Sequence, residues 1–163
     1  MKKLALQFIV FAGLMLLLTA CPYGSDVPID QANVKIDDKL LGKWETKNSS
    51  DYYYNVTKKD DFNYKFEKKS KNPSDAPTVY NGFLSVIDGV KFINISDESS
   101  STKLYYLYKI EQSTSGAKTT LIPVTENIDE KFTTSADLKA YIKKYMALSF
   151  FYEKDQDEYF RAD

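Results

Sequence analysis

The residue types that most often carry out chemistry are scarce in this chain. None of the 163 residues is a histidine, and Cys21 is the only cysteine. Nucleophiles activated by histidine, and zinc sites with histidine ligands, are therefore excluded by composition. Cys21 directly follows an apolar run, and its thiol has no second cysteine in the chain with which to form a disulfide. The setting of this thiol indicates covalent modification rather than redox or metal chemistry.

Carboxylates are the remaining candidates for catalysis. A glycosidase, for example, needs two of them about 5 to 10 Å apart in a cleft. The acidic residues Glu45, Asp51, Glu111 and Glu126 fall at expected strand ends and turns, and nothing in their spacing brings two of them together. Side chains in such positions are usually solvated. We therefore expect a protein that is not an enzyme and that has no catalytic residues, no metal site and no cofactor.

The N-terminus has the pattern of a secretory signal. Met1-Lys2-Lys3 is positively charged, and the run from Leu4 to Leu18 is almost entirely apolar. This run of about 15 residues is shorter than the roughly 20 that span a membrane as a helix, so a retained transmembrane anchor is the weaker alternative. The stretch Leu18-Thr19-Ala20-Cys21 resembles the lipobox of bacterial lipoproteins. The resemblance implies cleavage before Cys21 and acylation of its thiol.

The lipobox resemblance divides the chain into three parts. Residues 1–20 are the expected signal peptide, residues 21–34 a flexible lipidated tether rich in Pro, Gly, Ser and Asp, and residues 35–163 one folded domain. The resemblance implies a protein of the bacterial cell envelope that a lipid anchor attaches to a membrane, expected to be an outer membrane. Pro22 to Asp26 is only weakly acidic, which leaves open whether the domain faces the periplasm or the cell surface. A formal net charge of −1 argues against a nucleic-acid partner.

Alternation of apolar and polar residues predicts β-strands along most of the domain. Phe62, Tyr64 and Phe66 alternate with polar neighbours, as in a strand with one buried face. Asp88-Gly89 separates two such runs and is typical of a hairpin turn with positive φ at both residues. About eight strands are expected among nine strand-like runs, which cover 42–47, 52–58, 62–68, 79–87, 90–96, 103–112, 119–125 and, later in the chain, 147–154 and 157–162. Pro123 predicts a bulge or break in its strand, because proline cannot donate a backbone hydrogen bond.

A single helix is expected late in the chain. Leu138, Ile142 and Tyr145 share one face at helical spacing, together with Tyr141 and Met146. Thr134 and Asp137 form a plausible capping box at its start. A narrow apolar face of this kind is normally buried, so we expect the helix to pack against the outside of the sheet or across an end of it.

The segment from Ile36 to Glu45 resembles the first signature of lipocalins and related calycin barrels, in which a short helical turn leads into Gly-x-Trp, here Gly42 and Trp44. The resemblance implies an all-β, antiparallel, up-and-down barrel of about eight strands with one late α-helix. It also implies that Arg161 stacks on Trp44 and binds carbonyls of the first turn. The second lipocalin signature is absent, and Arg161 follows the helix instead of preceding it. The alternative is that Trp44 is an ordinary core residue and Arg161 an exposed terminal one.

Two functions are compatible with an anchored barrel. In the first, the interior binds a small apolar or lipid-like ligand, with wall residues drawn from Tyr53, Tyr64, Tyr80, Phe92 and Tyr106. The alternative for these aromatic residues is ordinary core packing. In the second function, the barrel docks on a cell-envelope protein complex, which a filled core and an exposed apolar patch would favour.

Overall fold

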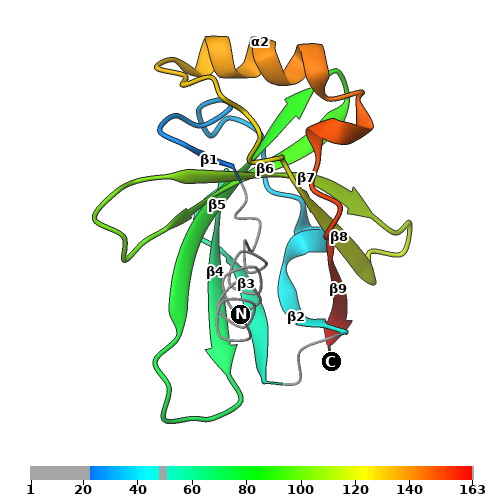
Figure 1. Cartoon of the computed structure of the whole chain (residues 1–163). Helices are drawn as coiled ribbons and strands as arrows, with labels where there is room; N and C mark the ends of the chain where they lie inside the picture. The colour runs from blue at the N-terminus through cyan, green and yellow to red at the C-terminus, as the bar shows by residue number, and fades with distance from the viewer. Residues whose placement is uncertain (1–22, 48–50, 163) are drawn as a thin grey trace, which may run out of the picture.

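The structure is a computed structural model that describes residues 23–47 and 51–162 (Figure 1). Most of this part of the chain is β-sheet. The strands are β1 Gly24–Ser25, β2 Gly42–Thr46, β3 Tyr52–Lys58, β4 Asn63–Ser70, β5 Thr78–Ile87, β6 Val90–Asp97, β7 Tyr105–Gln112, β8 Lys118–Pro123 and β9 Asp157–Ala162. The helices are the 3-10 turn η1 Asp38–Leu40, the α-helix α2 Ser135–Tyr145 and the 3-10 turn η2 Ser149–Phe151. No helix in these residues is long and apolar enough to cross a membrane.

Strands β2 to β9 form a closed barrel. Each strand pairs antiparallel with the next one along the chain, and β9 pairs with both β8 and β2, which closes the sheet on itself. The short strand β1 adds to β7 outside this ring. The prediction of an antiparallel, up-and-down barrel of eight strands with one late helix is thus confirmed. Closure leaves the eight strands without a free edge.

The pairing register divides the side chains into an inner and an outer set. Trp44 lies opposite Tyr54 on one side and opposite Arg161 on the other, so these three side chains point into the barrel. The inner core cluster consists of Leu40, Trp44, Val56, Tyr64, Leu84, Ile93 and Ile110. The predicted Asp88-Gly89 turn is confirmed, since both residues have positive φ, at 48° and 83°.

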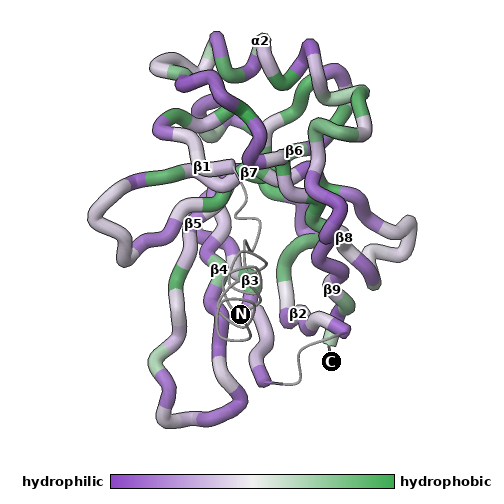
Figure 2. Tube along the Cα trace, in the orientation of Figure 1, coloured by the Kyte–Doolittle hydropathy of each residue, from purple (hydrophilic) through white to green (hydrophobic). Residues whose placement is uncertain are grey.

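A second hydrophobic core lies on the outside of the barrel, under α2. Leu138 and Ile142 of the helix are fully buried and pack with Phe92 and Leu107 of the sheet. In Figure 2 the helix alternates between hydrophobic and hydrophilic positions, as expected for a helix that buries one face. The backbone N–H of Asp137 donates to Thr134 Oγ1 at 3.2 Å, which confirms the predicted cap.

The segment predicted as a flexible tether is part of this outer core from residue 23 onward. Its strand β1 pairs with Tyr105 and Tyr106, and Ile29 is fully buried. The backbone N–H of Ile29 donates to Asn94 Oδ1 at 2.8 Å, and Asn94 Nδ2 donates in turn to Ser85 Oγ. The prediction for residues 23–34 is therefore corrected. Residues 21 and 22 lie outside the described part of the chain.

The strand predicted over residues 147–154 is also wrong. Residues 149–151 form η2, and one isolated bridge, between Val124 and Tyr152, is the β-pairing found there. The chain turns so that Phe151 is buried in the outer core, while the Tyr152 hydroxyl donates to the carbonyl of Met146. Pro123 is the last residue of β8. The pairing of β8 with β9 ends at Leu121, so the absence of an N–H at Pro123 removes no hydrogen bond to β9.

Replacing Ile29 by alanine tests whether residues 23–34 belong to the folded unit. We expect Ile29→Ala to lower the free energy of unfolding by about 2–4 kcal/mol, because it removes a fully buried side chain and leaves a cavity. Urea denaturation followed by Trp44 fluorescence measures the change. Leu148→Ala, at a side chain that is 40% exposed, is the control and should cost less than about 0.5 kcal/mol. Equal effects would mean that the segment does not contribute to stability.

Candidate functional site

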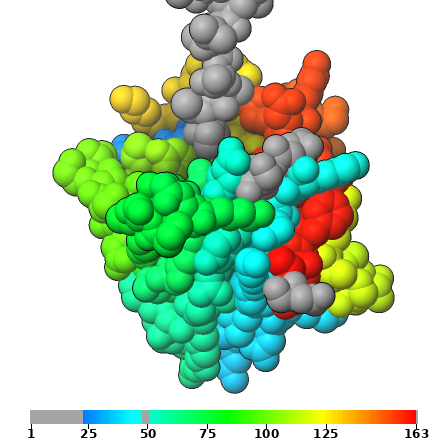
Figure 3. Space-filling view, turned by 90° about the horizontal axis from the view of Figure 1, so that it is seen from below, coloured from blue at the N-terminus to red at the C-terminus, as the bar shows by residue number. Residues whose placement is uncertain are grey.

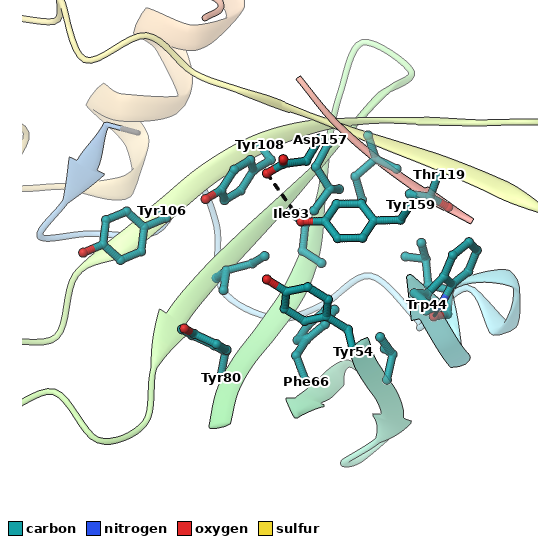
Figure 4. A pocket seen from close by; sticks show the side chains of 15 residues that line it. Trp44, Tyr54, Phe66, Tyr80, Ile93, Tyr106, Tyr108, Thr119, Asp157 and Tyr159 are labelled. Atoms are coloured by element: carbon teal, nitrogen blue, oxygen red, sulfur yellow. Dashed lines mark hydrogen bonds between the residues drawn. The ribbon is translucent and has the colours of Figure 1, made fainter. Parts of the chain in front are cut away.

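The inner core does not fill the barrel. A cavity of about 360 Å³ remains inside, at the lower end of the range for small-molecule sites. Every strand from β2 to β9 contributes to its wall. The lining residues are Leu40, Trp44, Tyr54, Val56, Phe66, Tyr80, Ile93, Ile95, Tyr106, Tyr108, Ile110, Thr119, Leu121, Asp157 and Tyr159 (Figure 4).

One end of the cavity is closed by η1, Trp44 and Arg161. The indole N–H of Trp44 donates to the carbonyl of Leu40 at 2.9 Å. The Arg161 guanidinium lies over the indole, with Cζ 4.8 Å from the ring, and donates to the carbonyls of Lys39 and Leu41 at 2.7 and 2.8 Å. The predicted contact between Arg161 and Trp44 is confirmed. A planar guanidinium is suited to this position, because it stacks and donates two bonds at the same time.

Gly42 and Tyr64 hold this closed end in shape. Gly42 has φ of +118°, which favours glycine, and a Cβ there would lie 2.7 Å from Arg161 Nη1, so a larger residue would displace the guanidinium from this position. Tyr64 is fully buried, and its hydroxyl accepts a hydrogen bond from the backbone N–H of Asp37 just before η1. Burial raises the pKa of the Tyr64 phenol to about 12. Tyr64 is therefore a neutral anchor for the turn.

The opposite end of the cavity, which we call the mouth, is lined by Tyr80, Tyr106, Tyr108 and Asp157. These residues lie on the strand ends that the register places farthest from η1. Figure 3 views the molecule from below, where β2, in cyan, lies beside β9, in red, as their pairing requires. In Figure 4 the mouth residues lie on one side and Trp44 and Thr119 on the other.

Two of the lining tyrosines, Tyr54 and Tyr159, pack against each other in the cavity wall. The Tyr54 ring packs edge-on against Tyr159, with centroids 5.4 Å apart, and against Tyr52, at 5.7 Å. Burial is the main cause that raises the pKa of Tyr54, Tyr108 and Tyr159 above the usual tyrosine value. Their phenols stay neutral at physiological pH, and Asp157 is the one acidic residue among the lining residues.

The structure brings together two of the five residues predicted for the wall. Tyr80 and Tyr106 line the cavity, whereas Tyr64 belongs to the closed end. Tyr53 lies on the outer face, where Lys43 Nζ is 4.9 Å from its ring, and Phe92 is buried in the outer core. The predictions for Tyr53, Tyr64 and Phe92 as wall residues are corrected. For Tyr53 and Phe92 the error is one of strand parity, since an error of one residue exchanges the two faces of a strand.

The sequence analysis missed Tyr54, Tyr108, Tyr159 and Asp157, although one signal could have found two of them. Residues two and four positions before Arg161 share its face of the strand. An Arg161 that contacts Trp44 inside the barrel therefore implies that Tyr159 and Asp157 also face inward.

Comparison with protein-family models, with curated proteins and with solved structures finds no match to this chain. Within residues 23–47 and 51–162, no group of three or more acidic, cysteine or histidine side chains is placed to hold a metal ion. Cys21 lies outside the described residues. What the site can do is therefore argued from the cavity itself.

Substitution of Arg161 tests how much the closed end contributes to stability. Arg161→Met removes two charge-assisted hydrogen bonds and the stacked guanidinium, and we expect it to lower the free energy of unfolding by about 1–3 kcal/mol. Arg161→Lys should recover only part of this loss, since an ammonium cannot make both bonds while stacked on the indole. Urea denaturation measures both variants. Full recovery by lysine would show that charge alone matters.

Proposed function

We propose that this protein is a lipid-anchored lipoprotein of the bacterial cell envelope whose barrel binds a small, largely apolar ligand without transforming it. The observation that carries the proposal is the cavity of about 360 Å³ inside the barrel. Eight-stranded barrels either fill their interior with side chains or hold one small ligand. Here the wall is made mainly of aliphatic and aromatic side chains, as in most small-molecule sites.

The architecture supports a lipocalin-like binding mode. The strands follow one another around the ring in chain order, and a 3-10 turn with Gly42, Trp44 and Arg161 closes one end. This arrangement is compatible with lipocalin-like barrels, in which the other end admits the ligand. The tyrosines at the mouth have apolar faces and polar tips, which suits a site between solvent and an apolar interior.

The anchor is proposed from the sequence around Cys21. The positive start, the short apolar run and the lipobox pattern that ends at Cys21 support export, cleavage and acylation. Two or three acyl chains would keep the protein on the membrane, since each buried methylene contributes about 0.8 kcal/mol. An outer membrane is the proposed location, and the membrane is the proposed partner through this anchor.

One observation favours a second candidate function, docking on an envelope protein. Phe150 is 70% exposed and Leu148 is 40% exposed, and both lie at η2 beside α2. Two side chains form a small patch, however, and an interior that is not filled favours ligand binding over docking.

The ligand-binding proposal is tested by purifying the protein from a bacterial envelope fraction and analysing its organic extract by mass spectrometry. We expect one co-purifying compound at about one molecule per protein, since the cavity has room for a single small ligand. Ile95→Phe, which narrows the cavity, should lose the compound. Tyr53→Phe, on the outer face, is the control and should retain it. A well-folded protein whose extract contains no such compound would contradict the proposal and favour docking.

The anchor is tested by Cys21→Ser, which removes the thiol that would be acylated. We expect the variant to lose the lipid mass seen by intact-protein mass spectrometry and to leave the membrane fraction if the signal is otherwise cleaved. Ser25→Ala, four residues farther on, should keep the wild-type mass and distribution apart from the lost oxygen. An unmodified Cys21 in wild-type protein would overturn the proposed anchor.

A further inference from the structure

The cavity wall contains a single acidic side chain, which hydrophobic binding does not require. Fifteen residues line the cavity, seven of them aromatic, and Asp157 is the one acidic residue among them. No lysine or arginine is among these fifteen residues. A site for a plain hydrocarbon has no use for a carboxylate, and a site for a fatty acid would place a positive group in its wall.

Asp157 lies exposed at the mouth of the cavity, next to tyrosine rings. It lies opposite Leu121 in the register of β8 and β9, and the Tyr159 hydroxyl donates to its Oδ2 at 3.4 Å (Figure 4). The pKa of Tyr108 is raised mainly by burial and, as the second cause, by the negative charge of Asp157. Asp157 forms no ion pair with any lysine or arginine that the structure describes. The carboxylate therefore has room for a cation from outside the chain.

The tyrosine rings around Asp157 are also suited to bind a cation. Tyrosine faces attract ammonium groups within about 6 Å, and the attraction grows as the cation loses water. The barrel already shows this contact at the mouth, where Lys68 Nζ lies 4.0 Å from the centre of the Tyr52 ring. Lys68 and Tyr52 are outside the cavity lining, so this contact leaves Tyr80, Tyr106 and Tyr108 available.

A second, independent feature lies at the closed end. Thr119 is 4% exposed and lines the cavity, and its Oγ1 has no hydrogen-bond partner among the residues that the structure describes. A buried hydroxyl without a partner is costly, so buried polar groups are normally bonded. Thr119 lies near Trp44, away from the mouth (Figure 4). This hydroxyl is placed to bond a polar atom at the inner end of a ligand.

We propose that the cavity binds a small amphiphilic amine. Its protonated amino group lies beside Asp157 and the tyrosine rings, its apolar body follows the aliphatic wall, and a hydroxyl or carbonyl at the inner end bonds Thr119. The inference rests on the proposed ligand-binding function and adds the chemical class of the ligand. It also excludes carboxylates as preferred ligands, because their charge would meet that of Asp157.

Four soluble probes of similar size test this inference on the full mature protein in detergent solution. They are 2-phenylethylamine, 2-phenylethanol, phenylacetate and tyramine, which is the same amine with a hydroxyl at the far end of the ring. Trp44 is the only tryptophan and lines the cavity, so its fluorescence reports binding, with calorimetry as a second readout. We expect 2-phenylethylamine to bind about tenfold more tightly than 2-phenylethanol, and phenylacetate to bind most weakly.

Two substitutions connect these affinities to the named residues. Asp157→Asn should remove the preference for the amine and leave the affinity for 2-phenylethanol unchanged. The control Asp155→Asn, at a residue that precedes β9 and does not line the cavity, should leave all four affinities unchanged. Tyramine should bind about threefold more tightly than 2-phenylethylamine, and Thr119→Val should abolish this difference.

The outcomes separate the ligand class from the proposed function. Equal binding of the amine and the alcohol, or a co-purifying compound without an amino group, would overturn the amine inference while ligand binding stands. Failure of all four probes together with an extract that contains no ligand would overturn both.

Discussion

The pairing of β9 with β2 is the interaction on which the rest of the structure depends. It closes the sheet, and it also places Arg161 opposite Trp44, so that the last strand holds the first turn of the domain. Because side chains alternate along β9, the same pairing places Tyr159 in the cavity wall and Asp157 at its mouth. Closure of the barrel and the chemistry of its cavity are thus set by one strand near the end of the chain.

The outer core stabilises the protein, whereas the interior of the barrel retains a cavity. The outer core joins α2, η2 and the N-terminal segment to one side of the barrel, and it buries large side chains such as Ile29, Phe92 and Ile142 completely. The interior therefore does not have to supply all of the hydrophobic burial that a domain of this size needs. This explains how a small barrel can keep a cavity without a large loss of stability.

The fold was largely predictable from sequence, whereas the composition of the cavity wall was predictable only in part. Alternation along the strands, the Asp88-Gly89 turn and the apolar face of α2 are local patterns, and each predicted its element correctly. Tyr53 and Phe92 were assigned to the wrong face because an aromatic residue can be buried on either side of a strand that is covered outside by other elements. The N-terminal segment was misjudged for a related reason. Its Pro, Gly and Ser content is typical of a linker, and only the tertiary contact of Ile29 with Asn94 shows that it is packed.

The packed N-terminal segment has a consequence for the proposed membrane anchor. The N–H of Tyr23 already donates to the carbonyl of Val124, so an acylated Cys21 would be separated from the folded domain by Pro22 alone. Two residues reach at most about 7 Å. Such a short connection would restrict the tumbling of the barrel and keep it close to the membrane surface. An amphiphilic ligand could then reach the mouth by lateral diffusion within the leaflet, in a two-dimensional search, instead of crossing the aqueous phase.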